Sequence, residues 1–280
     1  MNNLADYTPQ DILAVVHDEI ELAAEFYAAS PNPQAILLAG QPGAGKTVLS
    51  SMLLPTLDHN AVLINGDEYR RYHPNYRELY RTYGAESVSM TSAFSGEVTE
   101  RLIDELSDRK LNLIIEGTGR TVDVPRRTAL QLAEKGYMVS MAVIAVRPEV
   151  SLVSTLLRFY EMSQRGTIPR ATAMEAHDLV VAALPENLDA LAAVTAISAI
   201  GIWTRDQKMI YNSKTATERP SETLRRFWSR PWTEEERQRI RADIELLREN
   251  EKQMQLGQGD AIDALEQRVN RAITQNNQTR

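Results

Sequence analysis

The stretch AILLAGQPGAGKT, residues 35–47, decides the fold class of this chain. It starts as a short apolar strand, continues into a glycine-rich turn and ends where a helical pattern begins. Gly40, Gly45, Lys46 and Thr47 satisfy the pattern G-x-x-x-x-G-K-[ST] in the strand and helix context that such a loop requires. Backbone N–H groups of this turn and of the helix N-terminus point at phosphate oxygens, and glycine leaves room for that approach. The sequence therefore predicts a P-loop that binds ATP or GTP.

The P-loop predicts how the nucleotide is held, but it leaves the fate of the γ-phosphate open. Lys46 is expected to reach the β- and γ-phosphates, and the Thr47 hydroxyl is expected to hold Mg²⁺. Hydrolysis that drives a switch, transfer to a small molecule and binding without turnover all remain possible. The sequence lacks an Asn-Lys-x-Asp element of the kind a GTPase carries, which favours a small-molecule kinase. The expected nucleotide-binding residues are Gly40, Gln41, Pro42, Gly43, Ala44, Gly45, Lys46 and Thr47.

Strand and helix patterns alternate along most of the chain, which indicates a mainly parallel sheet with helices on both faces. Strands are expected at 35–39, 61–65, 111–117, 138–146, 195–203 and 208–212. Helices are expected at 8–29, from the P-loop to about 54, at 92–108, from Pro125, at about 148–164 and at about 172–183. We predict an α/β P-loop kinase domain over residues 1–217, including its N-terminal helix. Residues 218–280, rich in Arg, Glu, Gln and Leu, are expected to form a helical C-terminal extension with a solvated charged face.

Composition excludes several classes of protein. The 280 residues are long enough for a real core, and the net charge of −7 with no basic surplus argues against a nucleic-acid partner. The chain has no cysteine, so it has neither disulfides nor thiolate chemistry. Without an apolar stretch of eighteen residues or a signal-peptide pattern in MNNLADYTPQ, we expect a cytoplasmic protein with no membrane partner.

Two acids follow the predicted strand AVLIN, residues 61–65. Asp67 can serve as the base for an acceptor hydroxyl or as the N-cap of the next helix. We favour the base for Asp67 and the cap for Glu68, and we expect this strand to neighbour the P-loop strand. Glu116, at the end of the apolar run LNLIIEG, has the layout of a Walker-B carboxylate that holds Mg²⁺, although a turn residue is the alternative.

Arginines surround a predicted helix end in LLRFYEMSQRGTIPRA. Arg158, Arg165 and Arg170 lie around a Gly and Pro break, which favours a hinged lid that neutralises a transferred phosphoryl group over a solvated loop. His177, within a half-buried helical pattern, is interpreted as a structural group and not as a catalyst.

Taken together, these motifs resemble the zeta toxins of bacterial toxin–antitoxin systems. The resemblance rests on GQPGAGKT, on Asp67 with the nearby HPNY, on LIIEGTGRTVDVP, on AHDLVVAALPENL, and on Arg158 with PRAT. It implies an ATP- and Mg²⁺-dependent kinase that phosphorylates the 3′-hydroxyl of UDP-N-acetylglucosamine and so blocks peptidoglycan synthesis. It also implies a small epsilon-like antitoxin partner that masks the nucleotide site.

The resemblance assigns roles to particular residues. It implies that Asp67 is the base and that Lys46 holds the phosphates. Arg158 and Arg170 match the arginines that clamp ATP and the transferred phosphoryl group, and Glu116 matches the Walker-B-like acid. Residues that match the binding site for the UDP-sugar are Glu100, Thr118 and Arg120.

Two other functions compete with this one. The match is weaker over RTYGAESVSMTSAF, residues 81–94, so the acceptor could be another small alcohol or another nucleotide sugar. A nucleotide-dependent binding protein, in which turnover is incidental, is the alternative from a different class. Substitution of Asp67 by Asn separates them, because a kinase would lose transfer and keep ATP affinity.

Overall fold

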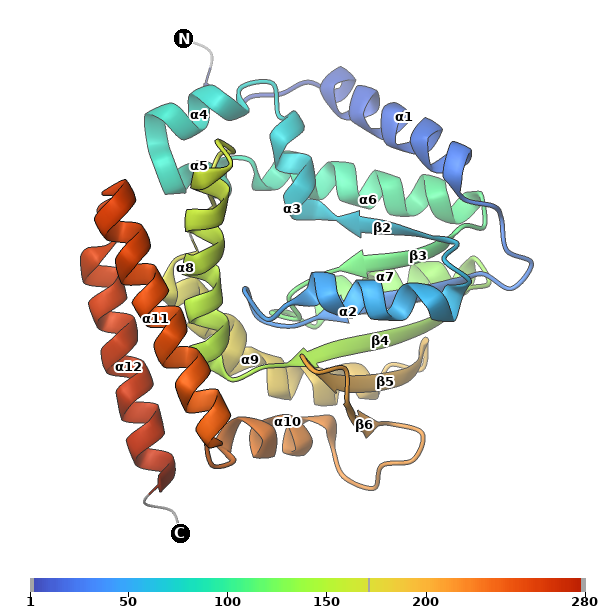
Figure 1. The fold of residues 1–280 in the computed structure, drawn as a ribbon. Helices are drawn as coiled ribbons and strands as arrows, with labels where there is room; N and C mark the ends of the chain where they lie inside the picture. The colour runs from blue at the N-terminus through green and yellow to red at the C-terminus, as the bar shows by residue number, and fades with distance from the viewer. Residues whose placement is uncertain (1–2, 171, 278–280) are drawn as a thin grey trace.

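The protein is described by a computed structural model that covers residues 3–170 and 172–277. Within these residues, six strands form one sheet in the order β2-β3-β1-β4-β5-β6 (Figure 1). All neighbouring pairs are parallel except β5 and β6, which are antiparallel. The strands are β1 (Gln34–Ala39), β2 (Ala61–Asn65), β3 (Asn112–Glu116), β4 (Met138–Ala145), β5 (Ile197–Thr204) and β6 (Met209–Asn212). The mainly parallel α/β fold predicted from the sequence is confirmed.

Helices cover both faces of this sheet. On one face the core is shared with α1, α6, α7, α9 and α10, and on the other it is shared with α2. The longer helices that build these layers are α1 (Pro9–Phe26), α2 (Lys46–Leu53), α6 (Ser92–Asp108), α7 (Asp123–Glu134), α8 (Pro148–Gln164), α9 (Met174–Ala192) and α10 (Pro220–Ser229). Shorter helices between β2 and α6 are α3 (Gly66–Tyr69), α4 (Tyr76–Tyr83) and α5 (Ser87–Met90). None of the helices in the described part is both long and apolar enough to cross a membrane.

Local sequence signals explain where several helices begin and end. Thr8 and Asp11 form a capping box at the start of α1, and proline follows as its first residue. The helix expected from Pro125 begins two residues earlier, so that Pro125 lies in its first turn. The helix expected to end near residue 183 continues to Ala192 and contains the buried Pro185 in its interior.

The position of β2 in the sheet differs from expectation. We expected the strand before Asp67 to lie next to the P-loop strand, but β2 pairs only with β3, and β3 separates it from β1. Sheet order depends on how the crossover helices pack, which no local pattern in the sequence encodes. The strand that ends in Glu116 therefore pairs with the P-loop strand, and the strand that leads to Asp67 does not.

The C-terminal extension is more than a solvated appendage. Its helices α11 (Glu234–Met254) and α12 (Gly259–Asn277) pack against α8, at the left of Figure 1. Ile244 and Leu247 of α11 and Leu265 of α12 join Tyr160 of α8 in a separate buried cluster. The charged residues do form the outer face, but the inner face completes a second hydrophobic core.

Candidate active site

The P-loop leaves β1 and turns sharply into α2. Gly43 has φ of 74°, and a Cβ at this position would meet the Ser151 carbonyl oxygen of α8 at 2.1 Å. Gly45, with φ of 98°, is the N-cap of α2 and offers no side-chain cap to the first helical N–H groups. The loop is held to the end of β4 because the Gln41 side-chain amide donates a hydrogen bond to the Val146 carbonyl oxygen over 2.7 Å. The backbone thus has the shape and the free donors of an anion cradle.

Lys46 connects the P-loop to the end of β3. Its Nζ donates to the Gly40 carbonyl oxygen over 3.1 Å and lies 3.6 Å from the Glu116 carboxylate. The two side chains are only 10% and 15% exposed. Burial lowers the pKa of Lys46, against the opposing effects of Glu116 and Asp67. The parallel pairing of β1 with β3 accounts for this contact, since Leu38 is opposite Glu116.

Asp67 lies in the first turn of α3, at the end of β2. The N-cap of this helix is Asn65, whose side-chain oxygen accepts a hydrogen bond from the Asp67 N–H over 3.1 Å. The interpretation of Glu68 as the cap was therefore wrong, because Asn65, three residues before Glu68, already occupies that position. The Asp67 side chain is 57% exposed, so its carboxylate is accessible to a substrate.

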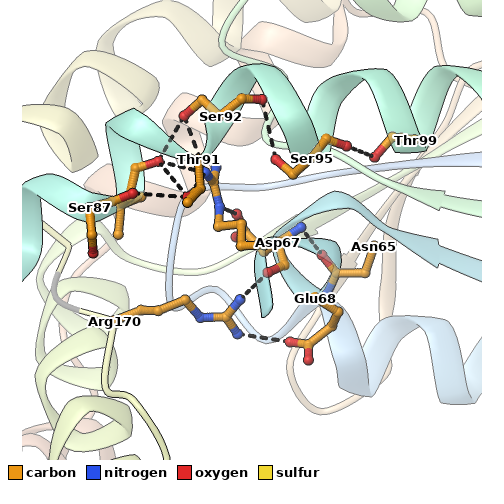
Figure 2. A network of polar contacts seen from close by, with 11 residues as sticks. Asn65, Asp67, Glu68, Ser87, Thr91, Ser92, Ser95, Thr99 and Arg170 are labelled. Atoms are coloured by element: carbon orange, nitrogen blue, oxygen red, sulfur yellow. Dashed lines mark hydrogen bonds and ion pairs between the residues drawn. The ribbon is translucent and has the colours of Figure 1, made fainter. Parts of the chain in front are cut away.

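Arg170 reaches Asp67 and Glu68 from the segment between α8 and α9. Its guanidinium donates to the Asp67 backbone carbonyl oxygen over 2.6 Å and to the Glu68 carboxylate over 2.8 Å (Figure 2). Gly166, at φ of 68°, lies just beyond the end of α8, where the hinge was expected. Ala171 of this expected lid lies outside the described residues. Glu68 thus pairs with the arginine that was expected to clamp the phosphoryl group.

Five of the predicted site residues act on one another electrostatically. Arg158 of α8 interacts with Asp67, Glu116 and Arg170, and Lys46 interacts with Glu116, Asp67 and Arg158. Burial raises the pKa of Asp67, but Arg70, Arg170 and Lys46 outweigh burial, and the net shift is downward. Burial raises the pKa of Glu116, with Asp67 adding to that rise. The structure thus brings together three cations and two carboxylates. The pKa of Asp67 is lowered and that of Glu116 is raised, and pairs of acids shifted apart in this way are common in catalytic sites.

The residues expected to bind a UDP-sugar are less closely grouped. Thr118 and Arg120 lie on the turn after β3, where the Thr118 carbonyl oxygen accepts a hydrogen bond from the Gly40 N–H over 3.3 Å. Asn187 of α9 supports this turn by donating to the carbonyl oxygens of Gly119 and Arg120 over 2.9 and 2.7 Å. Glu100, on α6, is paired over 2.5 Å with Arg127 of α7.

Comparison with known proteins supplies the family. The sequence model of the zeta toxin family matches residues 17–216. The chain is 37% identical to the toxin PezT of Streptococcus pneumoniae over 247 aligned residues. The alignment covers 88% of this chain and 98% of that protein. It is also 37% identical to the toxin zeta of Streptococcus pyogenes over 232 aligned residues, and this alignment covers 82% of this chain and 81% of that protein. This chain belongs to the zeta toxin family.

A solved structure agrees with the family assignment. A structure from the PezAT chromosomal toxin–antitoxin system of S. pneumoniae superimposes with a TM-score of 0.80 at 34% identity, covering 90% of this chain and all of that one. The zeta toxin fold of this chain is thus a P-loop kinase fold with a helical C-terminal extension, as predicted.

Three residues that the sequence did not single out support this zeta toxin site. Arg70 holds the Asp67 carboxylate and Asn187 holds the turn after β3. Arg205, on the turn after β5, donates to the carbonyl oxygens of Gly43 and Ala44 in the P-loop. Asn187 lies within AHDLVVAALPENL, so the family motif contained a signal for it, whereas the other two arginines are indistinguishable in sequence from surface residues.

Arg205 braces the outer side of the P-loop. Its guanidinium also donates to the Ser154 hydroxyl of α8 over 3.0 Å. Because the C=O and N–H groups of a trans peptide point in opposite directions, holding the Ala44 carbonyl oxygen outward turns the Gly45 N–H inward. We therefore expect Arg205→Ala to weaken ATP binding about 10-fold, by loss of hydrogen bonds to a charged group, and to leave adenosine binding unchanged. Isothermal titration with ATP, ADP and adenosine measures this, and an equal loss for all three would contradict it.

A cavity opens beside Thr47, an exposed residue in the first turn of α2. It has a volume of about 460 Å³, and the residues lining it are Thr47, Val48, Ser51, Met52, Pro55 and Gln207. The described residues contain no cluster of three or more His, Asp or Glu side chains that could hold a metal by themselves. Mg²⁺ is usually bound through one or two carboxylates together with substrate phosphates and water, and a site with so few protein ligands needs no such cluster. No carboxylate lines the cavity itself, whereas Glu116 lies beside Lys46 of the P-loop. Thr47 and Glu116 are the residues of this chain that would hold it.

His177 has the structural role that was expected. It is fully buried in α9, and its Nε2 lies 2.8 Å from the Ser151 hydroxyl of α8. Its Nδ1 lies 3.1 Å from Asp178, which is paired over 2.8 Å with Arg268 of α12. Burial lowers the pKa of His177. The histidine thus links α8, α9 and the C-terminal extension.

Proposed function

We propose that this protein transfers the γ-phosphoryl group of ATP to the 3′-hydroxyl of UDP-N-acetylglucosamine, and that it acts as the toxin of a toxin–antitoxin system by starving peptidoglycan synthesis. The observation that carries the kinase part is the grouping of Lys46, Arg158 and Arg170 with the accessible Asp67 carboxylate. The identity of the acceptor rests on membership of the zeta toxin family and on the EGTGRT turn.

The proposed reaction uses the side chains in distinct roles. The acceptor oxygen attacks the γ-phosphorus, the bond from that phosphorus to the β,γ-bridging oxygen breaks, and ADP leaves. The acceptor hydroxyl proton passes to the Asp67 carboxylate, whose lowered pKa keeps it ionised at neutral pH. Lys46, Arg158 and Arg170 offset negative charge on the phosphoryl oxygens, which is the main task in phosphoryl transfer. Mg²⁺, when bound, would add further positive charge next to the phosphates.

Glu100, Thr118 and Arg120 are proposed to bind the UDP-sugar. Thr118 and Arg120 lie on a turn that is hydrogen-bonded to the P-loop at Gly40, so a substrate on this turn would approach the γ-phosphate. For Glu100 to contact the acceptor, its ion pair with Arg127 has to open or to be shared with the substrate.

The decisive experiment measures the product. The protein is incubated with ATP, Mg²⁺ and a panel of UDP-sugars, other nucleotide sugars and simple alcohols, and mass spectrometry follows each acceptor. We expect UDP-N-acetylglucosamine to gain one phosphate and the position of that phosphate to be O3′ of the sugar. Phosphorylation of a different acceptor would replace the proposed substrate, and no phosphorylated product at all would favour a nucleotide-dependent binding protein.

A small antitoxin that covers the nucleotide site is the proposed partner. The structure with a TM-score of 0.80 comes from a toxin–antitoxin system, which supports this part of the proposal. Expression of this chain without a partner in a susceptible bacterium should arrest growth, whereas the Asp67→Asn variant should not. Unimpaired growth with the active wild-type protein would contradict the toxin role.

A further inference from the structure

Arg70 lies one helical turn after Asp67 and points back at its carboxylate. Its Nε donates to Asp67 Oδ1 over 3.0 Å. Its Nη1 lies 2.6 Å from the Val88 carbonyl oxygen, 3.2 Å from the Thr91 hydroxyl and 3.2 Å from the Ser92 hydroxyl. These acceptors surround the junction of α5 and α6, which Figure 2 shows facing Asp67 on the side opposite Arg170. Arg70 therefore connects the candidate base Asp67 to the junction of α5 and α6.

The surroundings distinguish Arg70 from a surface arginine. Its side chain is 13% exposed, whereas that of the neighbouring Arg71 is 58% exposed. A guanidinium fork fixes the angle as well as the distance of a carboxylate, which a flexible ammonium group does not. Only Oδ1 of Asp67 receives a side-chain hydrogen bond from the described residues, and the carboxylate remains accessible. Arg70 can thus hold one oxygen while the other faces a substrate.

We propose that Arg70 is a positioning residue for Asp67, one that fixes the carboxylate against the α5–α6 junction so that the free oxygen faces the acceptor hydroxyl. The proposal rests on the function proposed above. It adds that the segment 87–92 sets the position of the base through Arg70. A misplacement of about 1 Å can cost a hundredfold in rate, so a fixed carboxylate has a large effect.

Electrostatics give this role a signature of its own. The charged groups that face Asp67 are Arg70, Arg170 of the segment between α8 and α9, and Lys46 of α2, together with Glu116 of β3 and Arg158 of α8. Among these groups Arg70 lowers the pKa of Asp67 most. Because Arg70 stabilises the ionised carboxylate, its removal should raise the Asp67 pKa. The acid limb of kcat/KM, which reports the base of the free enzyme, should then move to higher pH.

The test compares Arg70→Gln, Arg70→Lys and the matched control Arg71→Ala in the full-length protein. Transfer to UDP-N-acetylglucosamine is followed across pH, and the Asp67 carboxyl is titrated separately by ¹³C NMR. We expect Arg70→Gln to lower kcat about 10- to 100-fold with little change in the KM for ATP, and to move both the acid limb and the carboxyl titration to higher pH. Arg70→Lys should restore the titration toward wild type but recover kcat only in part, since it supplies charge without the fork. Arg71→Ala should stay within about threefold of wild type, because exposed ion pairs contribute little.

The outcomes separate this proposal from the proposed function. If the wild-type protein phosphorylates none of the acceptors, the proposed function fails, and the NMR titration still tests Arg70. If the Asp67 carboxyl titrates at the same pH in Arg70→Gln as in Arg71→Ala, the positioning role is overturned. A loss of thermal stability with an unchanged titration and unchanged kcat in the folded fraction would also overturn it.

Discussion

Replacing Asp67 with Asn should lower kcat for phosphoryl transfer by about 10²- to 10⁴-fold, the contribution typical of a positioned general base. Asparagine has nearly the same shape, but its amide is a far poorer proton acceptor. ATP binding should not weaken, because Asp67 carries negative charge near Lys46 and its removal takes away a repulsion of the phosphates. Coupled measurement of ADP release, with ATP affinity measured by calorimetry, gives both quantities.

Glu68→Gln is the matched control for this substitution. Glu68 is the adjacent carboxylate, but its two oxygens are paired with Arg170 over 2.8 Å and with Arg71 over 3.9 Å. We expect less than about a tenfold change in kcat, as for the loss of a partly exposed ion pair. If Glu68→Gln were as damaging as Asp67→Asn, the base would have to be reassigned or shared between the two acids.

Replacing Leu247 with Ala should lower the free energy of unfolding by about 2 to 5 kcal/mol, the usual cost of a buried Leu-to-Ala change. Leu247 lies on α11 and is fully buried in the cluster formed with α8 and α12. We propose that residues 218–280 in this way stabilise the kinase domain of residues 1–217. Because α8 also carries Arg158 and contacts the P-loop at Ser151, transfer activity should be lost at a lower temperature in the variant. Thermal unfolding and activity measured over the same temperature range test this.

The neighbouring Leu246 supplies the control. Its side chain is 46% exposed, so Leu246→Ala removes much less contact. It should change stability by less than about 1 kcal/mol. Equal stability losses in the two variants would mean that α11 does not pack on α8 through Leu247.

Much of the site could be predicted because its residues follow local patterns. The P-loop needs glycine at fixed spacing between a strand and a helix, and that pattern is contained in thirteen consecutive residues, 35–47. Glu116 was placed correctly at the end of an apolar strand for a similar reason. The assignment of Glu68 as a helix cap was wrong because a cap is decided by backbone geometry, and Asn65 is the residue with extended φ and ψ.

Sequence alone determined the fold class, the phosphate cradle and the acids at the ends of strands, because backbone sterics and the period of apolar residues act over short distances along the chain. Only the tertiary structure decided which strand lies beside the P-loop, and which residues meet Asp67. Arg170 contacts the Asp67 peptide across 103 residues, and Arg205 reaches the P-loop across more than 160. Such contacts depend on sheet order and on helix packing, so residues with unremarkable surroundings in sequence become parts of one site. The same packing buries the apolar faces of the charged C-terminal helices α11 and α12 against α8.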